Sequence, residues 1–258
     1  MIGFLNWPPA LVVTACLIAA LAPPLLLTWL AAHASPRHIQ AYSGAEPAII
    51  GTVSLLFGLF AAFLANDIWT RNQTARQAVI EEADAIRNLA RLVEGQDKEN
   101  VETLRVALVD YIKVVIDKDW PLMQTGARSL DVLAKVRTIS NLIVTGPVGK
   151  TAGPVVQGRM LDAFVHMREK RQVRTILAEN RTFTIKWHAL ILFGLLTQLA
   201  ITVTHLNKPK PMLLAHVVFG LALATCLSIL VTNEFPFSAL NPISPEPLQT
   251  ALASLFRS

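Results

Sequence analysis

Residues 48–71 read AIIGTVSLLFGLFAAFLANDIWTR, and this stretch decides how the rest of the chain is interpreted. It contains no charged side chain before Asp67, so a single helix of this composition can cross the ~30 Å hydrocarbon core of a bilayer. It ends with Asn66, Asp67 and Trp69, which are polar and aromatic residues of the kinds found at membrane surfaces. The stretch therefore predicts a transmembrane helix over about 48–69.

Two rows of side chains, each repeating every four residues, give this helix two distinct faces. One row is small, lets another backbone approach closely, and consists of Ser54, Gly58 and Ala62. The other row is bulky and mostly apolar, and consists of Thr52, Leu56, Phe60 and Leu64. Such a helix fits either a sealed bundle or a pore in which the bulky row forms a hydrophobic constriction. In a pore, Asn66, Asp67 and Arg71 would lie at the mouth. A ring of Asp67 side chains would favour cations, and a ring of Arg71 side chains would favour anions.

Three further apolar runs occur in the chain, and they span residues 10–32, 187–205 and 212–232. Soluble domains carry about 25% charged residues, whereas this chain carries 16%. All but four of the 23 basic residues and all but four of the 18 acidic residues lie between residues 70 and 186. The pattern predicts an all-α integral membrane protein, with four transmembrane helices in a 2 + 2 arrangement around a charged helical domain.

The predicted domains follow these runs. We expect a first transmembrane pair in residues 1–69, a helical domain in 70–182, a second pair in 183–232 and a proline-rich tail in 233–258. Basic residues crowd at the ends of the helical domain, so the positive-inside rule places this domain and the tail in the cytoplasm. A signal peptide cleaved after Ala34 competes with a retained first helix, but residues 1–9 contain no Lys or Arg.

Within the helical domain, apolar residues at helical spacing predict helices over about 75–93, 99–118, 121–143 and 159–180. Glu82 falls on the apolar stripe of its helix, and a buried carboxylate needs a basic partner. Arg168 lies on the predicted inner row of the last helix and Arg171 lies about one turn further along, so we expect one of them to form a structural ion pair with Glu82. Residues 248–256 predict a short amphipathic helix on the membrane surface.

No pattern predicts a catalytic, metal-binding or cofactor-binding site. The two cysteines, Cys16 and Cys226, lie in apolar runs, which disfavours a disulfide framework and a thiolate metal site. The segment GPVGKT (146–151) ends like a phosphate-binding loop, but the glycine that this motif requires five residues before Gly149 is replaced by Val144. The segment also follows a predicted helix rather than a strand. We interpret this segment as part of a flexible connector. The net charge of +5 is explained by basic residues at a membrane surface, without nucleic-acid binding.

Four segments together carry a resemblance to a known family, and they are LFGLFAAFLANDIW (56–69), ARQAVIEEADAIRNLARL (75–92), REKRQVR (168–174) and NEFPFSALNPISPEPLQTAL (233–252). Their order and spacing resemble the bestrophin-like domain family of prokaryotic membrane proteins, long catalogued as a domain of unknown function. In the last segment, Glu234 and Ala239 stand where the family has Asp and Gly. The resemblance implies a bacterial inner-membrane protein distantly similar to bestrophin anion channels, whose second helix lines the pore neck and whose subunits form a ring.

These observations favour a homo-oligomeric ion channel, with the lipid bilayer, inorganic ions and copies of the same chain as partners. A non-conducting membrane scaffold or sensor, whose cytoplasmic helices bind a partner protein, is the alternative from another class. We do not expect an enzyme, because no catalytic grouping is readable. A channel requires a continuous axial path through an oligomer, whereas a scaffold requires a sealed bundle and an exposed apolar patch on residues 100–143.

Overall fold

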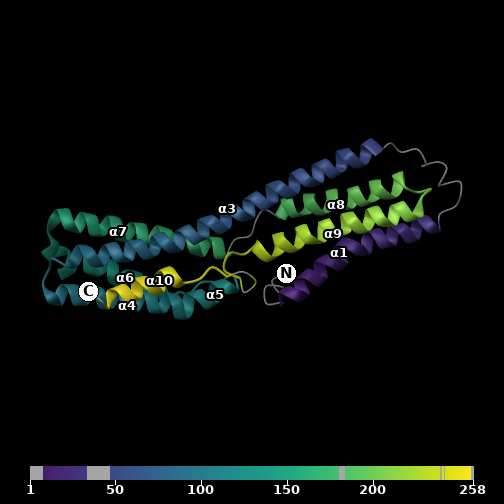
Figure 1. The fold of residues 1–258 in the computed structure, drawn as a ribbon. Helices are drawn as coiled ribbons and strands as arrows, with labels where there is room; N and C mark the ends of the chain where they lie inside the picture. Colours follow the sequence, from purple (N-terminus) through teal and green to yellow (C-terminus); the bar gives the residue numbers. More distant parts are fainter. Residues whose placement is uncertain (1–7, 34–46, 180–183, 239, 241, 257–258) are drawn as a thin grey trace. The chain divides into compact units, whose positions relative to one another are not determined.

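The computed structural model describes residues 8–33, 47–179, 184–238, 240 and 242–256, and every regular element in these ranges is helical (Figure 1). Four of the helices are long and apolar enough to cross a membrane, and they are α1 (Pro9–Ala32), α3 (Pro47–Val93), α8 (Thr184–Thr204) and α9 (Pro209–Asn233). The others are α4 (Lys98–Val114), the π-helical turn η2 (Val115–Asp119), α5 (Trp120–Gln124), α6 (Asp131–Val144), α7 (Pro147–Glu179) and α10 (Glu246–Leu255). The predicted all-α membrane fold is confirmed.

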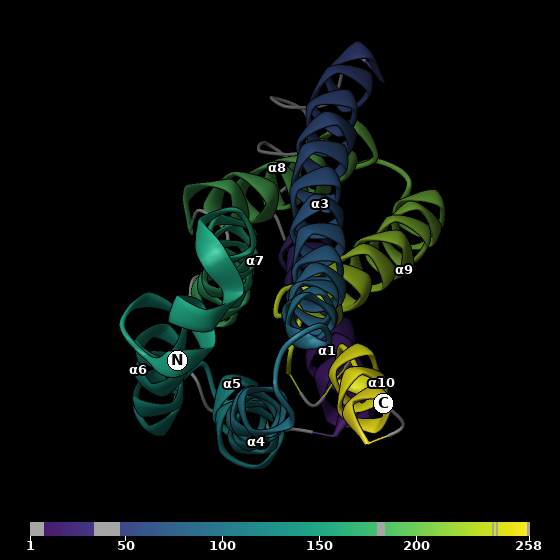
Figure 2. The ribbon, with the colours of Figure 1, turned by 90° about the vertical axis from the view of Figure 1, so that its left-hand side faces the viewer.

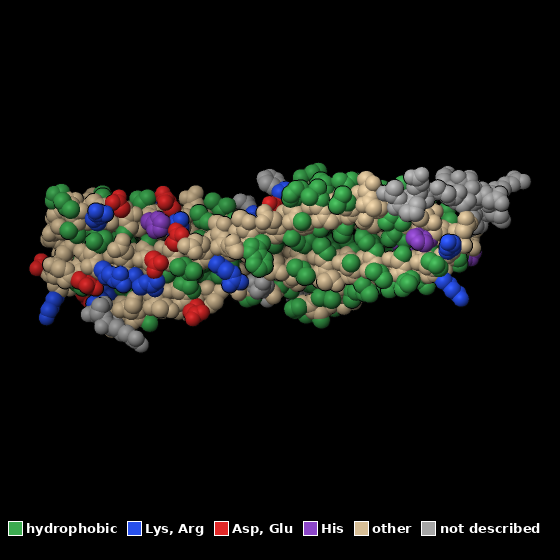
Figure 3. All heavy atoms as spheres, turned by 45° about the horizontal axis from the view of Figure 1, so that its top comes forward, with side chains coloured by type: hydrophobic (Ala, Val, Ile, Leu, Met, Phe, Trp, Pro, Cys, Tyr) green, Lys and Arg blue, Asp and Glu red, His purple; other side chains and the backbone are tan. Residues whose placement is uncertain are grey.

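The chain divides into two compact units. The apolar unit comprises residues 3–70 and 181–234, and the polar unit comprises residues 71–180 and 235–258. Hydrophobic side chains gather over the helices of the apolar unit, and Lys, Arg, Asp and Glu side chains gather over those of the polar unit (Figure 3). Helix α3 contributes to both units, because it contains no proline after its first position and continues as one helix of 47 residues.

In the apolar unit, α1 packs lengthwise against α9, and α8 lies beside both (Figure 1). Helices α1 and α9 approach each other closely at Gly220, where an added Cβ would lie 2.6 Å from the Leu21 side chain. Helix α3 joins this unit through aromatic rings, since Phe57 meets Phe219 of α9 edge-on at a centroid distance of 5.4 Å. Small residues and interlocking rings therefore hold these helices together, as expected where lipid offers no hydrophobic driving force between helices.

Two prolines, Pro23 and Pro24, lie inside α1 and remove two backbone donors from it. Because Pro24 has no N–H, the carbonyl of Ala20, four residues earlier, lacks its usual helical partner. The side-chain amide of Gln198 in α8 donates a 2.9 Å hydrogen bond to this carbonyl, and both residues are fully buried. A neighbouring helix thus satisfies the group that the proline releases, which makes the proline tolerable inside an apolar helix.

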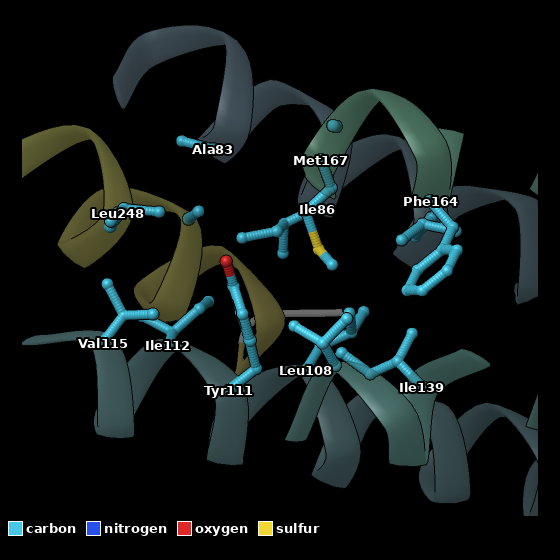
Figure 4. Packing of buried hydrophobic residues seen from close by; sticks show 14 of the residues in the cluster. Ala83, Ile86, Leu108, Tyr111, Ile112, Val115, Ile139, Phe164, Met167 and Leu248 are labelled. Carbon is cyan, nitrogen blue, oxygen red and sulfur yellow. The ribbon is translucent and has the colours of Figure 1, made fainter. Parts of the chain in front are cut away.

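The polar unit is a helical bundle around one hydrophobic core, to which α3, α4, α6, α7 and α10 contribute buried residues. In Figure 2, α4 is seen nearly end-on. Tyr111 of α4 lies among Leu108, Ile112 and Leu248, with its hydroxyl directed away from α4 towards the helix that carries Ala83 (Figure 4). The Tyr111 hydroxyl finds its hydrogen-bond partner, Glu82, inside this apolar core.

The structure differs from the sequence-based expectations in three elements of the polar unit. The helix predicted over 121–143 is interrupted between α5 and α6, where Gly126 has a φ of 77° that other residues rarely adopt. The predicted connector 145–158 is largely helical, because α7 begins at Pro147 and only kinks at Gly153, where φ is 76°. The physical reason is that proline suits the first turn of a helix, so Pro147 and Pro154 start helical segments rather than ending them.

The third difference concerns α10, which we expected to lie on the membrane surface. Its apolar face instead packs into the core of the polar unit, where Leu248, Ala251 and Leu255 are buried, and it contacts α4. An amphipathic helix buries its apolar face against whichever apolar surface is nearest, and the helical bundle provides one.

The first prediction concerns the amide bond that covers the Ala20 carbonyl. Gln198→Leu removes the only hydrogen bond that the described residues supply from a side chain to this carbonyl, so we expect a loss of about 1–2 kcal/mol in the free energy of unfolding in detergent. Thr197→Val is the matched control, because Thr197 is also buried in α8 but bonds only to Phe193 O of its own helix. Equal melting temperatures for the two variants would contradict the assigned role of Gln198.

Candidate functional site

The apolar half of α3 has one face that packs against its own chain. Phe57, Ala61, Leu64 and Ile68 form this inner row, and they contact α8 and α9 in a cluster that includes Leu190 and Leu230. The spacing of four, three and four residues keeps the inner row on one side of the helix. Leu64 and Ile68 are buried, so this row is fixed inside the protomer.

The opposite face of the same helix is covered by little of its own chain. At about 100° per residue, Leu55, Leu59, Phe63 and Asn66 lie within roughly 50° of the direction opposite the inner row. All four are exposed, and Leu55 reaches 72% of its maximal accessible area. The most apolar stretch of α3 is 6% buried, against 22–39% for the other three candidate spans. We name Leu55, Leu59, Phe63 and Asn66 the outer row.

The bulky row predicted from the sequence is divided between these two environments. Thr52 and Leu56 are exposed, whereas Phe60 packs against Phe193 of α8 at a centroid distance of 4.9 Å and Leu64 is completely buried. A row with a four-residue repeat drifts around a helix of 3.6 residues per turn, which carries its end into the protomer. The pore-lining role of this row stays a prediction.

The small row lies between the inner and outer rows. A Cβ added to Gly58 would meet no atom within 4 Å, and Ala62 is exposed. Ser54 is half-buried and donates its hydroxyl to the carbonyl of Ile50, 2.6 Å away in its own helix. The side of the helix at Gly58 is therefore open to close approach by another backbone, and the packing role predicted for this row stays a prediction.

The three polar residues predicted at a pore mouth have different surroundings. Asn66 is exposed on the outer row. Asp67 forms a salt bridge with Lys186, at the start of α8. Arg71, which belongs to the polar unit, donates a 3.5 Å hydrogen bond to the carbonyl of Leu177. The two charged side chains are thus engaged within one protomer, and the uncharged one faces outward.

A second group of polar side chains is enclosed in the core of the polar unit. Glu82 is completely buried, as predicted, but its basic partner is Arg174 rather than Arg168 or Arg171. Arg174 donates two hydrogen bonds to the carboxylate of Glu82, from Nε to Oε2 at 2.8 Å and from Nη2 to Oε1 at 3.2 Å. This bidentate geometry is the strong form of an arginine–carboxylate pair.

The predicted partners are wrong because the inner face of α7 is not the row that contains Arg168. The buried row runs through Met160, Ala163, Phe164, Met167, Arg171, Arg174 and Ala178. Arg168 is exposed beside it, and its guanidinium lies 5.8 Å from the centre of the Phe164 ring. The spacing of Met160, Phe164 and Met167 is the signal that identifies the correct face, because methionine and phenylalanine are mostly buried residues.

Asp119 and Arg171 complete this buried ion cluster. Asp119 is the last residue of the π-helical turn η2, is completely buried, and accepts a 2.7 Å hydrogen bond from the backbone N–H of Ser129. Its Oδ2 lies 3.4 Å from Nη2 of Arg174 and 3.6 Å from Nη2 of Arg171. The two carboxylates and two guanidiniums cancel in formal charge, which is the condition under which charges are tolerated in a core.

Two aromatic rings surround the cluster. The hydroxyl of Tyr111 donates a 2.6 Å hydrogen bond to Oε1 of Glu82, and the ring of Trp120 lies 5.1 Å from the guanidinium carbon of Arg174. Burial, together with the negative charge of Glu82, raises the pKa of Tyr111 well above its usual range, so the phenol stays protonated. Burial by itself would lower the pKa of Arg174, but the Glu82 carboxylate outweighs it and raises this pKa above its usual value.

What the cluster can do chemically is limited by this arrangement. Its charged atoms are turned towards one another, and no cluster of three or more His, Cys, Asp or Glu residues suited to a metal ion occurs among the described residues. The cluster is therefore a structural device that fixes α3, α4 and α7 together in the polar unit. The exposed apolar side chains of the outer row of α3 are a separate feature, which belongs to the apolar unit.

The second prediction tests the buried pair. Glu82→Gln leaves Asp119 as the single carboxylate of the cluster to balance Arg171 and Arg174, so we expect a loss of about 3–5 kcal/mol in the free energy of unfolding. Glu81→Gln is the control on the neighbouring residue, whose carboxylate lies 2.6 Å from Lys170 with a quarter of its side chain exposed. Exposed pairs contribute at most about 1 kcal/mol. Similar small losses for both variants, measured by thermal denaturation in detergent, would contradict the buried position of Glu82.

Comparison with known proteins adds information on relatives. A family model described as the bestrophin-like domain matches residues 18–248. No curated protein matches the sequence significantly. A crystal structure of a point mutant of a bacterial bestrophin homologue from Klebsiella pneumoniae aligns with a TM-score of 0.71 at 15% identity, covering 93% of this chain and 98% of that chain. Another structure of a bestrophin homologue from the same organism, solved by zinc phasing, gives a TM-score of 0.66 at 13% identity, with 97% and 98% covered.

Proposed function

The chain belongs to the bestrophin-like domain family, and from this premise we propose that several copies assemble into a ring that forms an ion channel in a membrane. The resemblance to bestrophin anion channels supports the channel, and the second candidate span, α3, supplies its wall. The single observation that carries the proposal is the uncovered outer row of an otherwise apolar helix. A long apolar face that its own chain leaves open needs either lipid or another copy of the protein against it.

The proposed ring determines which side of α3 faces its axis. A pore-lining helix contacts its own protomer on one side, a neighbour on each flank, and the axis on the side opposite its own protomer. The inner row, Phe57, Ala61, Leu64 and Ile68, occupies the protomer side. The outer row, Leu55, Leu59, Phe63 and Asn66, is then axial. The predicted row through Leu56, Phe60 and Leu64 lies one residue further along, and we keep it as the competing assignment.

An axial row of this kind would gate by excluding water. Rings of Leu55, Leu59 and Phe63 have no group that can replace the hydration shell of an ion, so a narrow pore would conduct only when it widens enough to stay wet. Asn66 would follow at one end as an uncharged ring. Because Asp67 and Arg71 have partners within the protomer, neither is proposed as the ring that selects the sign of the ion.

The flank that carries Ser54, Gly58 and Ala62 is proposed to meet the α3 helix of the next copy. Gly58 and Ala62 offer room for a close backbone approach, which gains dispersion contacts where lipid supplies no hydrophobic driving force. Basic residues are numerous in the segments that join the spans to the polar unit. The loop between α8 and α9, at the other end of these two spans, contains only two, Lys208 and Lys210. The positive-inside rule supports a bacterial inner-membrane protein whose polar unit is cytoplasmic.

The non-conducting scaffold remains the second candidate because of a specific surface feature. Large apolar side chains on residues 100–143 are exposed, namely Val106, Leu122, Leu130 and Leu133. A partner protein could cover them in a scaffold. Ion flux distinguishes the two candidates, since a scaffold carries none.

The third prediction is that purified protein in liposomes conducts ions and that Phe63→Ala raises the flux severalfold, because it removes the largest ring of the outer row. Phe60→Ala is the matched control, because Phe60 is the same residue type but its side chain packs on Phe193. This variant should leave the flux nearly unchanged while lowering stability. The reverse result would favour the competing row. No flux from any variant, with the oligomer intact, would replace the channel by the scaffold.

The fourth prediction concerns assembly. Ala62→Phe places a large ring on the open flank, so we expect a smaller oligomer in detergent, measured by light scattering. Ile80→Phe is the control, because Ile80 is an exposed residue of the same helix within the polar unit. A normal oligomer for Ala62→Phe with blocked flux would place Ala62 on the axis instead of the flank.

A further inference from the structure

A histidine is enclosed within the apolar unit. His216 belongs to α9, which is one of the four candidate membrane spans, and its side chain is only 1% exposed. It lies roughly 10 Å along this helix from Pro209, at 1.5 Å per residue. An ionisable side chain inside a membrane span is costly unless its surroundings satisfy it. The contacts of His216 therefore decide which protonation state the fold accepts.

One nitrogen of the ring is held by the neighbouring helix α8. Nε2 of His216 lies 3.0 Å from Oγ1 of Thr202, and this hydroxyl lies 3.0 Å from the carbonyl oxygen of Gln198. A hydroxyl has one hydrogen to donate. Because Thr202 donates its hydrogen to the Gln198 carbonyl in its own helix, its oxygen accepts the hydrogen bond from the Nε2–H group of His216. A neutral ring therefore carries its proton on Nε2, and the bond joins α9 to α8.

The other nitrogen of the ring has no partner. Nδ1 of His216 is buried, and no described residue forms a hydrogen bond with it. Protonation at Nδ1 would create an N–H group without an acceptor and a positive charge in an apolar environment. Both are costly in a buried site, and the cost disappears once the ring reaches water.

The helices packed around His216 supply no negative charge to offset a proton. The ionisable side chains that the described residues place at this end of the apolar unit, where α1 and α8 end and α9 begins (Figure 1), are all basic, and they are His33, His205, Lys208 and Lys210. Helix α3 carries no charged side chain between Pro47 and Asp67. A protonated His216 would therefore meet repulsion rather than a counter-ion.

From these contacts we propose that His216 is a pH-sensitive latch between α8 and α9. The neutral ring holds the two helices together, and protonation favours arrangements in which the ring is released to water. The latch lies in the half of α9 that adjoins the turn from α8. In the proposed orientation this turn is on the outer side of the membrane, so the latch responds to acidification outside the cell. Only this choice of side rests on the proposed function.

The experiment measures how the stability of the full-length protein depends on pH. Below about pH 6.5, where an ordinary histidine is protonated, the unfolded chain binds a proton that the closed latch excludes, so folded stability falls as the pH falls. Thermal denaturation in detergent is compared at about pH 8 and about pH 5, the range in which histidine titrates. We expect the melting temperature to fall by about 5 °C more in the unaltered protein than in His216→Gln. Glutamine keeps an N–H group for Thr202 but does not titrate.

Two variants show which histidine is responsible. His188→Gln is the matched control, because His188 is an exposed residue of α8, and it should keep the full pH dependence. His205→Gln removes the neighbouring ring, whose Nδ1 bonds to the carbonyl of Ile201, and it should also keep the pH dependence. Equal pH dependence in His216→Gln and the unaltered protein overturns the latch, and so does loss of the pH dependence in His205→Gln.

A second measurement tests the hydrogen-bond geometry directly. Nitrogen-15 spectra of the histidine rings at about pH 8 distinguish a proton on Nε2 from a proton on Nδ1. We expect His216 to carry its proton on Nε2, with the signal assigned by its loss in His216→Gln, or in His216→Asn if the first variant does not fold. A proton on Nδ1 overturns the proposal, because Thr202 would then donate to the ring. Neither measurement depends on ion flux.

Discussion

The hydrocarbon core of a bilayer contains no water to satisfy a backbone N–H or carbonyl group, and the rest of this structure depends on that constraint. It explains why the four apolar runs are helices and why the prolines of α1 need help from another helix. The released carbonyl of Ala20 is covered by Gln198, a buried amide that would be costly in hydrocarbon without such a partner. This hydrogen bond therefore links α1 to α8 inside the apolar unit.

The same constraint gives α3 its unusual character. Its inner row packs on α8 and α9, while its outer row is apolar and left open by its own chain. In water such a face would promote aggregation, and in a membrane it is stable against lipid or another copy. Family membership, a small-residue flank and an open apolar row opposite the protomer are separate observations, and all three are consistent with a ring built around α3. The charged side chains near this face, Asp67 and Arg71, are held by partners within the protomer.

The polar unit is subject to a different constraint, because four charged groups are enclosed in its core. Glu82, Asp119, Arg171 and Arg174 balance in formal charge, and Tyr111 and Trp120 fill the space around them. Desolvating these groups is costly, so the arrangement is stable only when each carboxylate has its basic partners in place. It specifies how α3, α4 and α7 come together more strictly than apolar contacts alone would, since apolar side chains tolerate several packings.

The sequence by itself determined the class of the protein and much of its organisation. Long apolar runs, charges crowded into one segment and the order of four family segments predicted an all-α membrane protein, because hydropathy and helical period are local properties of the chain. They also predicted that Glu82 is buried and needs an arginine. Tertiary structure alone decided which arginine it is, since Arg168, Arg171 and Arg174 lie within two turns of one helix and the packing of that helix determines which of them meets Glu82. It likewise placed α10 in the core and carried Phe60 and Leu64 into the protomer, because the side of a helix that is buried depends on which neighbours pack against it.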